Sequence, residues 1–264
     1  PEHLSYHGTF QAYAKAKANI VNHQSSKDVV IFNPASPTTN EIALQSSGEK
    51  FRFTTNNSPA YCYIKGNEIF VGTDQIIRID EIPLLGPGNL ENVLAAITVG
   101  KILGVDSEKI RKAVHEFKPL PHRLEYVGEK NGVIFYNDSL ATIPEATINA
   151  LEALGTDVET LIAGGFDRGL DFAVLGNFLA RREGLKNLVL FPTTGEKIWR
   201  AIVSTGKTNP LKKFDIESME DAVQIALDNT APGKICVLSP ASASFGLFKN
   251  YEERGNAFKK LISH

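Results

Sequence analysis

The sequence predicts an α/β protein whose C-terminal part is a doubly wound, Rossmann-like domain built on a parallel sheet. Beyond residue 121, apolar β-branched runs alternate with helical runs, which is typical of a parallel sheet covered by helices on both faces. Residues 118–121 read Lys-Pro-Leu-Pro, a stiff extended stretch because each proline disfavours helix in the residue before it. The chain of 264 residues is long enough for about two domains. We therefore expect domains at 1–118 and 119–264.

The composition is that of a folded globular chain without a dominant charge. Hydrophobic residues make up 42%, charged residues 22%, and the formal net charge is -2, so nothing drives the whole chain toward nucleic acid. No apolar run reaches the roughly 18 residues that a membrane helix needs. We expect a cytoplasmic monomer that neither binds nucleic acid nor inserts into a membrane. Cys62 and Cys236 lie in apolar runs and suit buried thiols better than a disulfide.

The first 118 residues should combine helices with short strands. Apolar residues at helical spacing predict a helix at 9–22. A second helix follows the Gly-Pro-Gly-Asn turn at 86–89 and ends at Gly104, and a third covers 107–117. Short β-like runs between turn-forming residues predict strands at 29–32, 51–54, 61–64, 68–71 and 76–79.

In the second half, each strand-like run precedes a helix-like run. Strands are expected at 133–136, 160–163, 188–191 and 235–238, with helices starting near 144, 171, 195 and 248 and a further one at 218–228. Doubly wound domains bind ligands at the carboxyl ends of their strands. The candidate site therefore consists of three polar clusters that follow strands: Asn137-Asp138-Ser139, Gly164-Gly165-Phe166-Asp167-Arg168 and Ser239-Pro240-Ala241-Ser242-Ala243-Ser244.

These stretches also have a purely structural interpretation, and Ser239 to Ser244 fit residues that cap or approach a helix. Thr142 with Glu145 three residues later fits a capping box at the start of the next helix. Gly164-Gly165 fits a tight turn, and Arg168 fits a solvated surface charge.

Three further observations bear on cofactors. His3 is a single histidine near a terminus, and Lys17 flanks an apolar helix face, where lysines usually extend their ammonium group to water. The 264 residues contain no GxxxxGK[ST] phosphate loop and no complete GxGxxG after a strand. The common nucleotide-binding fingerprints are therefore missing.

Taken together, the motifs resemble the Mur ligase family over nearly the whole chain. The most specific pieces, in order, are His122-Arg123, Asn137-Asp138-Ser139 with Ala141-Thr142, Gly164-Gly165, Leu238 to Ser244, Phe248 to Tyr251 and Glu253-Arg254-Gly255. The resemblance implies the back of an α/β ATP-binding central domain in residues 1–118 and a glutamate-binding Rossmann-like domain in 119–264. It implies a ligase of peptidoglycan precursor synthesis that uses ATP and Mg²⁺. Its substrates would be UDP-N-acetylmuramoyl-L-alanine and glutamate, joined through an acyl phosphate.

The resemblance also implies roles for individual residues. Arg123 and Asp138 resemble the pair that contacts ATP, and Asn89 resembles the asparagine that meets the adenine. His3 resembles the histidine that holds magnesium, and Lys17 the carbamylated lysine, whose negative charge would help to hold the metal. The implied glutamate pocket comprises Ser139, Thr142, Arg168, Ser244 and Tyr251.

The sequence departs from the family pattern at three positions. Leu140 and Arg168 stand where the family has lysine, and Gly88 stands where it usually has histidine. Arginine still supplies a planar cation that can grip a carboxylate with two hydrogen bonds, which leucine cannot do. The stretch 164–172 also resembles family members that add L-glutamate, so D- and L-glutamate both remain open.

The family's uridine-nucleotide domain and phosphate loop are expected to precede Pro1, so we expect this chain alone to be inactive. Two other functions stay open. One is a non-catalytic module that binds a nucleotide or a partner. The other is a folylpolyglutamate-synthetase-like ligase, against which the stretch 239–254 argues.

Overall fold

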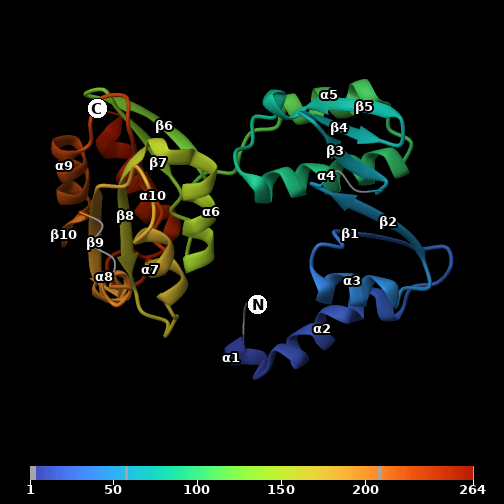
Figure 1. The fold of residues 1–264 in the computed structure, drawn as a ribbon, viewed down its shortest axis with the longest axis horizontal. Coiled ribbons are helices and arrows are strands. Elements are labelled where there is room, and N and C mark those ends of the chain that lie inside the picture. The colour runs from blue at the N-terminus through green and yellow to red at the C-terminus, as the bar shows by residue number, and fades with distance from the viewer. Residues whose placement is uncertain (1–3, 57–58, 207–209, 264) are drawn as a thin grey trace. The chain divides into compact units, whose positions relative to one another are not determined.

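The computed structural model describes residues 4–56, 59–206 and 210–263. The chain separates into two compact units, residues 1–118 and 119–264, and each has its own sheet (Figure 1). None of the helices within the described ranges is long and apolar enough to cross a membrane.

The N-terminal unit is a five-stranded sheet with helices around it. Its strands are β1 (Val29–Phe32), β2 (Glu49–Thr54), β3 (Cys62–Lys65), β4 (Glu68–Val71) and β5 (Asp74–Arg78), in that spatial order. The first three run parallel, and β4 and β5 are antiparallel to their neighbours. The helices are α1 (Leu4–His7), α2 (Phe10–Asn22), α3 (Pro37–Leu44), α4 (Pro87–Ile102) and α5 (Ser107–Glu116), with a 3-10 turn at Ile79–Glu81.

Helix α4 packs its apolar face on the strands of this unit. Val93, Leu94 and Ile97 from α4 join Ile69 and Ile77 from the sheet in one buried cluster. Burial of such side chains contributes on the order of 1.5–3 kcal/mol each. The predicted helices at 9–22 and 107–117 are present within a residue of their expected limits, and the helix expected after the turn at 86–89 begins earlier, at Pro87, within that turn. Cys62 and Cys236 are buried free thiols, as expected, and burial raises the pKa of Cys62 to about 12.

Helix α3 was not predicted from the sequence. Ser36 caps it by accepting a hydrogen bond from the Thr39 backbone N–H at 3.4 Å, and Pro37 occupies its first turn. Ser followed by Pro is a recognisable helix start. The eight residues of α3 bury only Ala43, so no apolar stripe marks the helix.

The C-terminal unit is a six-stranded sheet in the order β10-β9-β8-β11-β7-β6. The five strands β7 to β11 are mutually parallel, and β6 pairs antiparallel with β7, which confirms the expected fold class. The strands are β6 (Glu125–Lys130), β7 (Val133–Asn137), β8 (Val158–Gly165), β9 (Asn187–Thr193), β10 (Lys212–Asp215) and β11 (Ile235–Leu238). The two edge strands, β6 and β10, were not predicted because they are rich in charged residues, as solvent-facing edges usually are.

Helices cover both faces of this sheet. One buried cluster contains apolar residues of α6 (Pro144–Leu154), α7 (Ala173–Leu179) and α8 (Thr194–Val203), and the other contains those of α9 (Met219–Asn229) and α10 (Tyr251–Ile262). Strand β8 contributes side chains to both clusters, because successive side chains of a strand point to opposite faces of the sheet. Leu161 and Ala163 belong to the first cluster, and Ile162 belongs to the second.

Helix α6 begins at Pro144 as predicted, whereas α7 begins at Ala173 instead of 171. Helix α10 begins at Tyr251 instead of 248, because Asn250 caps it by accepting from the Glu253 N–H at 2.8 Å. The alternative interpretation of Thr142, a capping box, does not hold. Ile143 occupies the cap position of α6 without a side-chain hydrogen bond, and Pro144 begins the helix. Thr142 is thereby left without a capping role.

Candidate functional site

The three predicted polar clusters meet at the carboxyl edge of the C-terminal sheet. Strand β11 lies between β8 and β7, so the loops that follow these strands are neighbours. Main-chain hydrogen bonds join them: Asp138 N donates to Leu238 O at 2.8 Å, Gly164 N to Pro240 O at 2.8 Å, and Phe166 N to Ala243 O at 2.9 Å. The loops therefore form one connected surface.

The Gly164-Gly165 pair makes this close approach possible. Gly164 has φ +94° and Gly165 has φ +145°, backbone conformations that side chains rarely adopt. A Cβ on Gly165 would lie 2.5 Å from the carbonyl oxygen of Ala243. The two glycines end strand β8 instead of forming the tight turn that was the alternative interpretation, and they permit the close contact with the loop after β11.

Asp138 is a buried carboxylate at the centre of the edge. It is 5% exposed, and its Oδ1 accepts from Leu124 N at 3.1 Å while its Oδ2 accepts from Ser239 Oγ at 2.8 Å. Burial raises the pKa of Asp138 to about 6, against the lowering effect of these hydrogen bonds and of the Arg123 charge. Arg123 itself is exposed. Its neighbours His122 and Leu124 have φ 64° and 44°, a strained turn of the kind that clusters at functional sites.

Ser139 and Arg254 lock the loop after β7 to helix α10. Arg254 is 1% exposed; its Nε donates to Ser139 Oγ at 3.0 Å, its Nη2 to Ser139 O at 2.8 Å and its Nη1 to Ser242 O at 3.1 Å. Ser139 Oγ in turn donates to Tyr251 O at 2.8 Å. The Ser139 hydroxyl therefore uses its hydrogen bonds to hold the loop after β7 against α10.

Arg254 carries a charge that no carboxylate neutralises within 4.0 Å among the described residues. Burial lowers the pKa of Arg254 to about 9, which still leaves the guanidinium protonated at neutral pH. No role was predicted for Arg254 from the sequence. The sequence does indicate that Arg254 is buried. Arg254, Phe258 and Ile262 are four residues apart and therefore lie on one face of α10, the buried face.

His122 packs against the same helix. A Cβ on Gly255 would lie 2.2 Å from His122 Nδ1, so only glycine fits there. Asn137 Nδ2 lies 2.9 Å from His122 Nδ1 and 3.1 Å from Glu125 Oε2, and Lys259 Nζ donates to Glu125 Oε1 at 2.6 Å. Burial lowers the pKa of His122, so the neutral ring accepts at Nδ1 from the Asn137 amide.

The predicted amino-acid pocket residues lie on these loops with differing exposure. Arg168 is exposed, Thr142 and Tyr251 are half-buried, and Ser244 is buried. The Arg168 Cζ lies 5.2 Å from the centroid of the Phe245 ring, directly after Ser244 in the chain. The Tyr251 ring meets the His122 ring edge-on at 6.0 Å. Arg168 is thus a cation on the rim of a surface that also carries hydroxyl groups.

The remaining candidates belong to the N-terminal unit. Asn89 Nδ2 donates to Leu85 O at 2.8 Å at the start of α4. Lys17 is exposed on α2, with its Nζ 5.5 Å from the Tyr13 ring centroid, and it lines a hollow of about 710 Å³ together with Thr38 and Thr39. His3 lies outside the described residues. In the part of the chain that the structure covers, no three His, Cys, Asp or Glu side chains come together to hold a metal.

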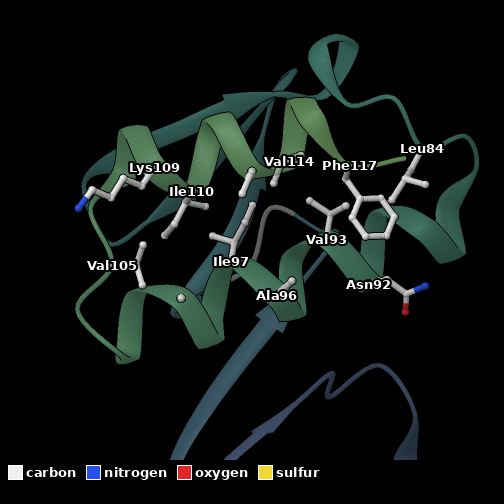
Figure 2. A pocket seen from close by; sticks show the side chains of 12 residues that line it. Leu84, Asn92, Val93, Ala96, Ile97, Val105, Lys109, Ile110, Val114 and Phe117 are labelled. Carbon is white, nitrogen blue, oxygen red and sulfur yellow. The ribbon is translucent and has the colours of Figure 1, made fainter. Parts of the chain in front are cut away.

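A second hollow in this unit is almost wholly apolar. It lies between α4 and α5 and has a volume of about 370 Å³, and its lining includes the small residues Ala96, Gly100 and Ala113. Figure 2 shows the Phe117 ring beside Val93 and Leu84, with Lys109 at the opposite end. Since the other lining residues apart from Asn92 are apolar, this hollow has no groups suited to catalysis.

Comparisons with known proteins agree on one family. The Mur ligase middle domain matches residues 1–100, and the Mur ligase, glutamate ligase domain matches residues 122–242. The chain is 40% identical over 261 residues to the UDP-N-acetylmuramoylalanine--D-glutamate ligase of Geobacillus kaustophilus, covering 98% of this chain and 56% of that protein. It is 34% identical over 263 residues to the protein of the same name from Caldanaerobacter subterraneus, covering 99% and 58%. The chain thus spans little more than half of these relatives.

Solved structures share the fold at lower identity. MurF from Acinetobacter baumannii superposes with a TM-score of 0.74 at 18% identity, over 99% of this chain and 57% of that one. MurF ligase from Thermotoga maritima, in complex with ADP, gives 0.68 at 17% identity, over 99% and 60%. E. coli FolC, in complex with DHPP and ADP, gives 0.64 at 16% identity, over 92% and 57%. At such identities the likeness concerns the fold alone.

Proposed function

Because this chain belongs to the Mur ligase family, with both a middle and a glutamate ligase domain, we propose that the full-length gene product is an ATP-dependent carboxylate-amine ligase. It joins D-glutamate to UDP-N-acetylmuramoyl-L-alanine in peptidoglycan precursor synthesis. Relatives that carry the D-glutamate ligase name at 34% and 40% identity support this choice of amino acid. Since the chain spans 56% to 58% of those relatives, the proposal concerns the full-length protein.

The observation that carries the proposal is the exposed Arg168 on the joined loops of the carboxyl edge. Glutamate brings two carboxylates, and removing either from water without a cation or several donors costs several kcal/mol. Arg168 can hold one carboxylate through two parallel hydrogen bonds. Thr142 and Ser244 offer hydroxyl donors, and the half-buried Tyr251 ring covers the side chain. Ser139 acts indirectly, by holding the loop through Arg254 and Tyr251.

In this reaction the C-terminal unit orients the amino group of glutamate for attack on an activated carboxyl group. Holding the nucleophile in place converts a bimolecular encounter into an oriented one. ATP, when bound, supplies the phosphoryl group that activates the carboxylate. We assign Arg123 to the phosphates, because it is exposed and cationic, and Asp138 to the support of that loop through Leu124. Asn89 is assigned to the adenine.

The described residues do not by themselves make a magnesium site. Lys17 is exposed beside Tyr13, and the described part of the chain brings no trio of acidic, histidine or cysteine side chains together. We therefore derive no step through the metal. Lys17 as a carbamylated residue and His3 as its companion ligand stay proposals for the full-length protein.

The test is a ligation assay with the full-length gene product. It is incubated with ATP, Mg²⁺, UDP-N-acetylmuramoyl-L-alanine and either D- or L-glutamate, and both phosphate release and the mass of the nucleotide product are measured. We expect phosphate release and product only when all substrates are present, with D-glutamate as the amino acid. If product forms with L-glutamate and not with D-glutamate, the amino acid is L-glutamate. Nucleotide binding without any product would indicate a non-catalytic module. Product with a folate acceptor would indicate a FolC-like ligase.

A further inference from the structure

Arg168 is an exposed cation at the rim of the candidate site. Within the described ranges no Asp or Glu oxygen lies within 4.0 Å of its guanidinium, whereas Arg78 pairs with Asp80 and Arg200 with Glu196. Its recorded contact is with an aromatic face, 5.2 Å from the guanidinium Cζ to the centroid of the Phe245 ring. A cation at this distance from a ring is attracted to the ring face, and no acceptor within the described ranges takes a hydrogen bond from the Arg168 guanidinium.

The Phe245 ring is itself held in place. Phe166 meets it edge-on with ring centroids 5.9 Å apart and planes at 87°. Phe166 is fixed by its backbone bridge to Ala243, with Phe166 N donating to Ala243 O at 2.9 Å. Both rings remain 46% exposed, so the pair keeps apolar surface in water at the rim of the candidate site.

We propose that Phe245 is a positioning residue, whose ring restrains the guanidinium of Arg168 so that its N–H groups receive a carboxylate of glutamate. This inference rests on the proposed function, and it assigns to Phe245 the task of orienting the Arg168 guanidinium toward glutamate. A long, flexible side chain loses rotamer freedom when it binds a ligand, and holding it in advance reduces that loss. Because Leu140 gives no second cation nearby, the presentation of Arg168 should affect glutamate affinity directly.

The kinetic test uses the full-length protein. Phe245→Leu should raise the glutamate KM about three- to fivefold, the size of an exposed cation–ring contact, and leave kcat and the ATP KM unchanged. Phe245→Tyr keeps the ring and should restore the wild-type KM. Leu247→Ala, which truncates an exposed apolar residue two positions after Phe245, is the matched control and should change nothing.

A double-mutant cycle shows whether Phe245 acts through Arg168. In an Arg168→Ala background, Phe245→Leu should have no further effect on the glutamate KM. An equal effect in both backgrounds, or a Tyr variant that behaves like Leu, would overturn the proposal.

A spectroscopic measurement reports the contact without any substrate. In the 264-residue chain, the Nε–H proton of Arg168 should show an upfield ring-current shift relative to that of the exposed Arg181, and the shift should vanish in Phe245→Leu. Absence of the shift in the wild type would overturn the inference, whatever the ligation assay shows. If the shift is present and the protein ligates no glutamate, the proposed function has failed, and the role of Phe245 in binding glutamate falls with it.

Discussion

Arg254 Nη2 donates to the backbone carbonyl oxygen of Ser139 at 2.8 Å, across 115 positions of the chain. The bond ties helix α10 to the loop after β7, and Arg254 Nη1 extends the tie to Ser242 in the loop after β11. Desolvating a guanidinium costs several kcal/mol unless its donors are used, and here Nε, Nη1 and Nη2 all donate. The loops of the candidate site are thus held by a helix that follows them all in the sequence.

Replacing Arg168 by alanine should weaken the binding of glutamate selectively. Loss of a bidentate charge pair is worth roughly 2 kcal/mol or more, so the glutamate KM should rise at least about tenfold while the ATP KM barely moves. Steady-state kinetics of the full-length protein measure both values. Arg181→Ala, an exposed arginine after α7, is the control. Equal weakening of both substrates would remove Arg168 from the pocket and direct attention to Lys249.

Gly165→Ala should destabilise the C-terminal unit. The added Cβ would lie 2.5 Å from Ala243 O in a backbone conformation, φ +145°, that is essentially restricted to glycine. We expect a loss of about 2 kcal/mol or more in the free energy of unfolding, measured by urea denaturation. Gly169→Ala is the matched control, because Gly169 also has a positive φ, +75°, but has nothing within 4 Å of the added atom. If both variants lose the same stability, the contact between the loops is not the cause.

Asp138→Asn should change how stability depends on pH. The pKa of Asp138 is raised from 3.8 to about 6, so the folded state holds a proton that the unfolded state releases between these values. The wild type therefore loses stability on the order of 3 kcal/mol as pH rises from about 4 to about 7, and the asparagine variant lacks this loss.

Urea denaturation of the 264-residue chain at pH 4.5 and at pH 7.5 measures the difference. Relative to the wild type, Asp138→Asn should be more stable at pH 7.5 than at pH 4.5. Glu183→Gln, which removes an exposed carboxylate, should keep the wild-type slope. Parallel pH profiles for Asp138→Asn and the wild type would show that Asp138 does not titrate in this range.

Residues 119–264 should fold without the rest of the chain. Both buried clusters that flank the six-stranded sheet consist of residues from this unit alone. A protein comprising these residues should show one cooperative thermal transition by circular dichroism. A non-cooperative transition, while the 264-residue chain unfolds cooperatively, would mean that the N-terminal unit is needed for folding.

The local sequence pattern was sufficient to predict the buried strands of the C-terminal unit. The strands at 133–136, 160–163, 188–191 and 235–238 all lie within observed strands, since each is an apolar run. Edge strands such as Lys212–Asp215 were missed, because a strand that faces water on one side carries no such run. Local pattern also left two interpretations of Thr142 open. Its spacing from Glu145 satisfies the capping rule, but Pro144 starts the helix two residues later.

The sequence by itself determined that polar clusters follow three parallel strands, and so that they share one edge of a sheet. It also determined the resemblance to the family, because the order and spacing of the motifs between His122 and Gly255 can be seen in the sequence. Only the tertiary structure decided which groups touch: Asp138 with Ser239, Ser139 with Arg254, and Arg168 with Phe245. The reason is physical. Strand and helix patterns follow from contacts over a few residues, whereas these pairs are 101, 115 and 77 positions apart and meet only when the whole sheet has formed.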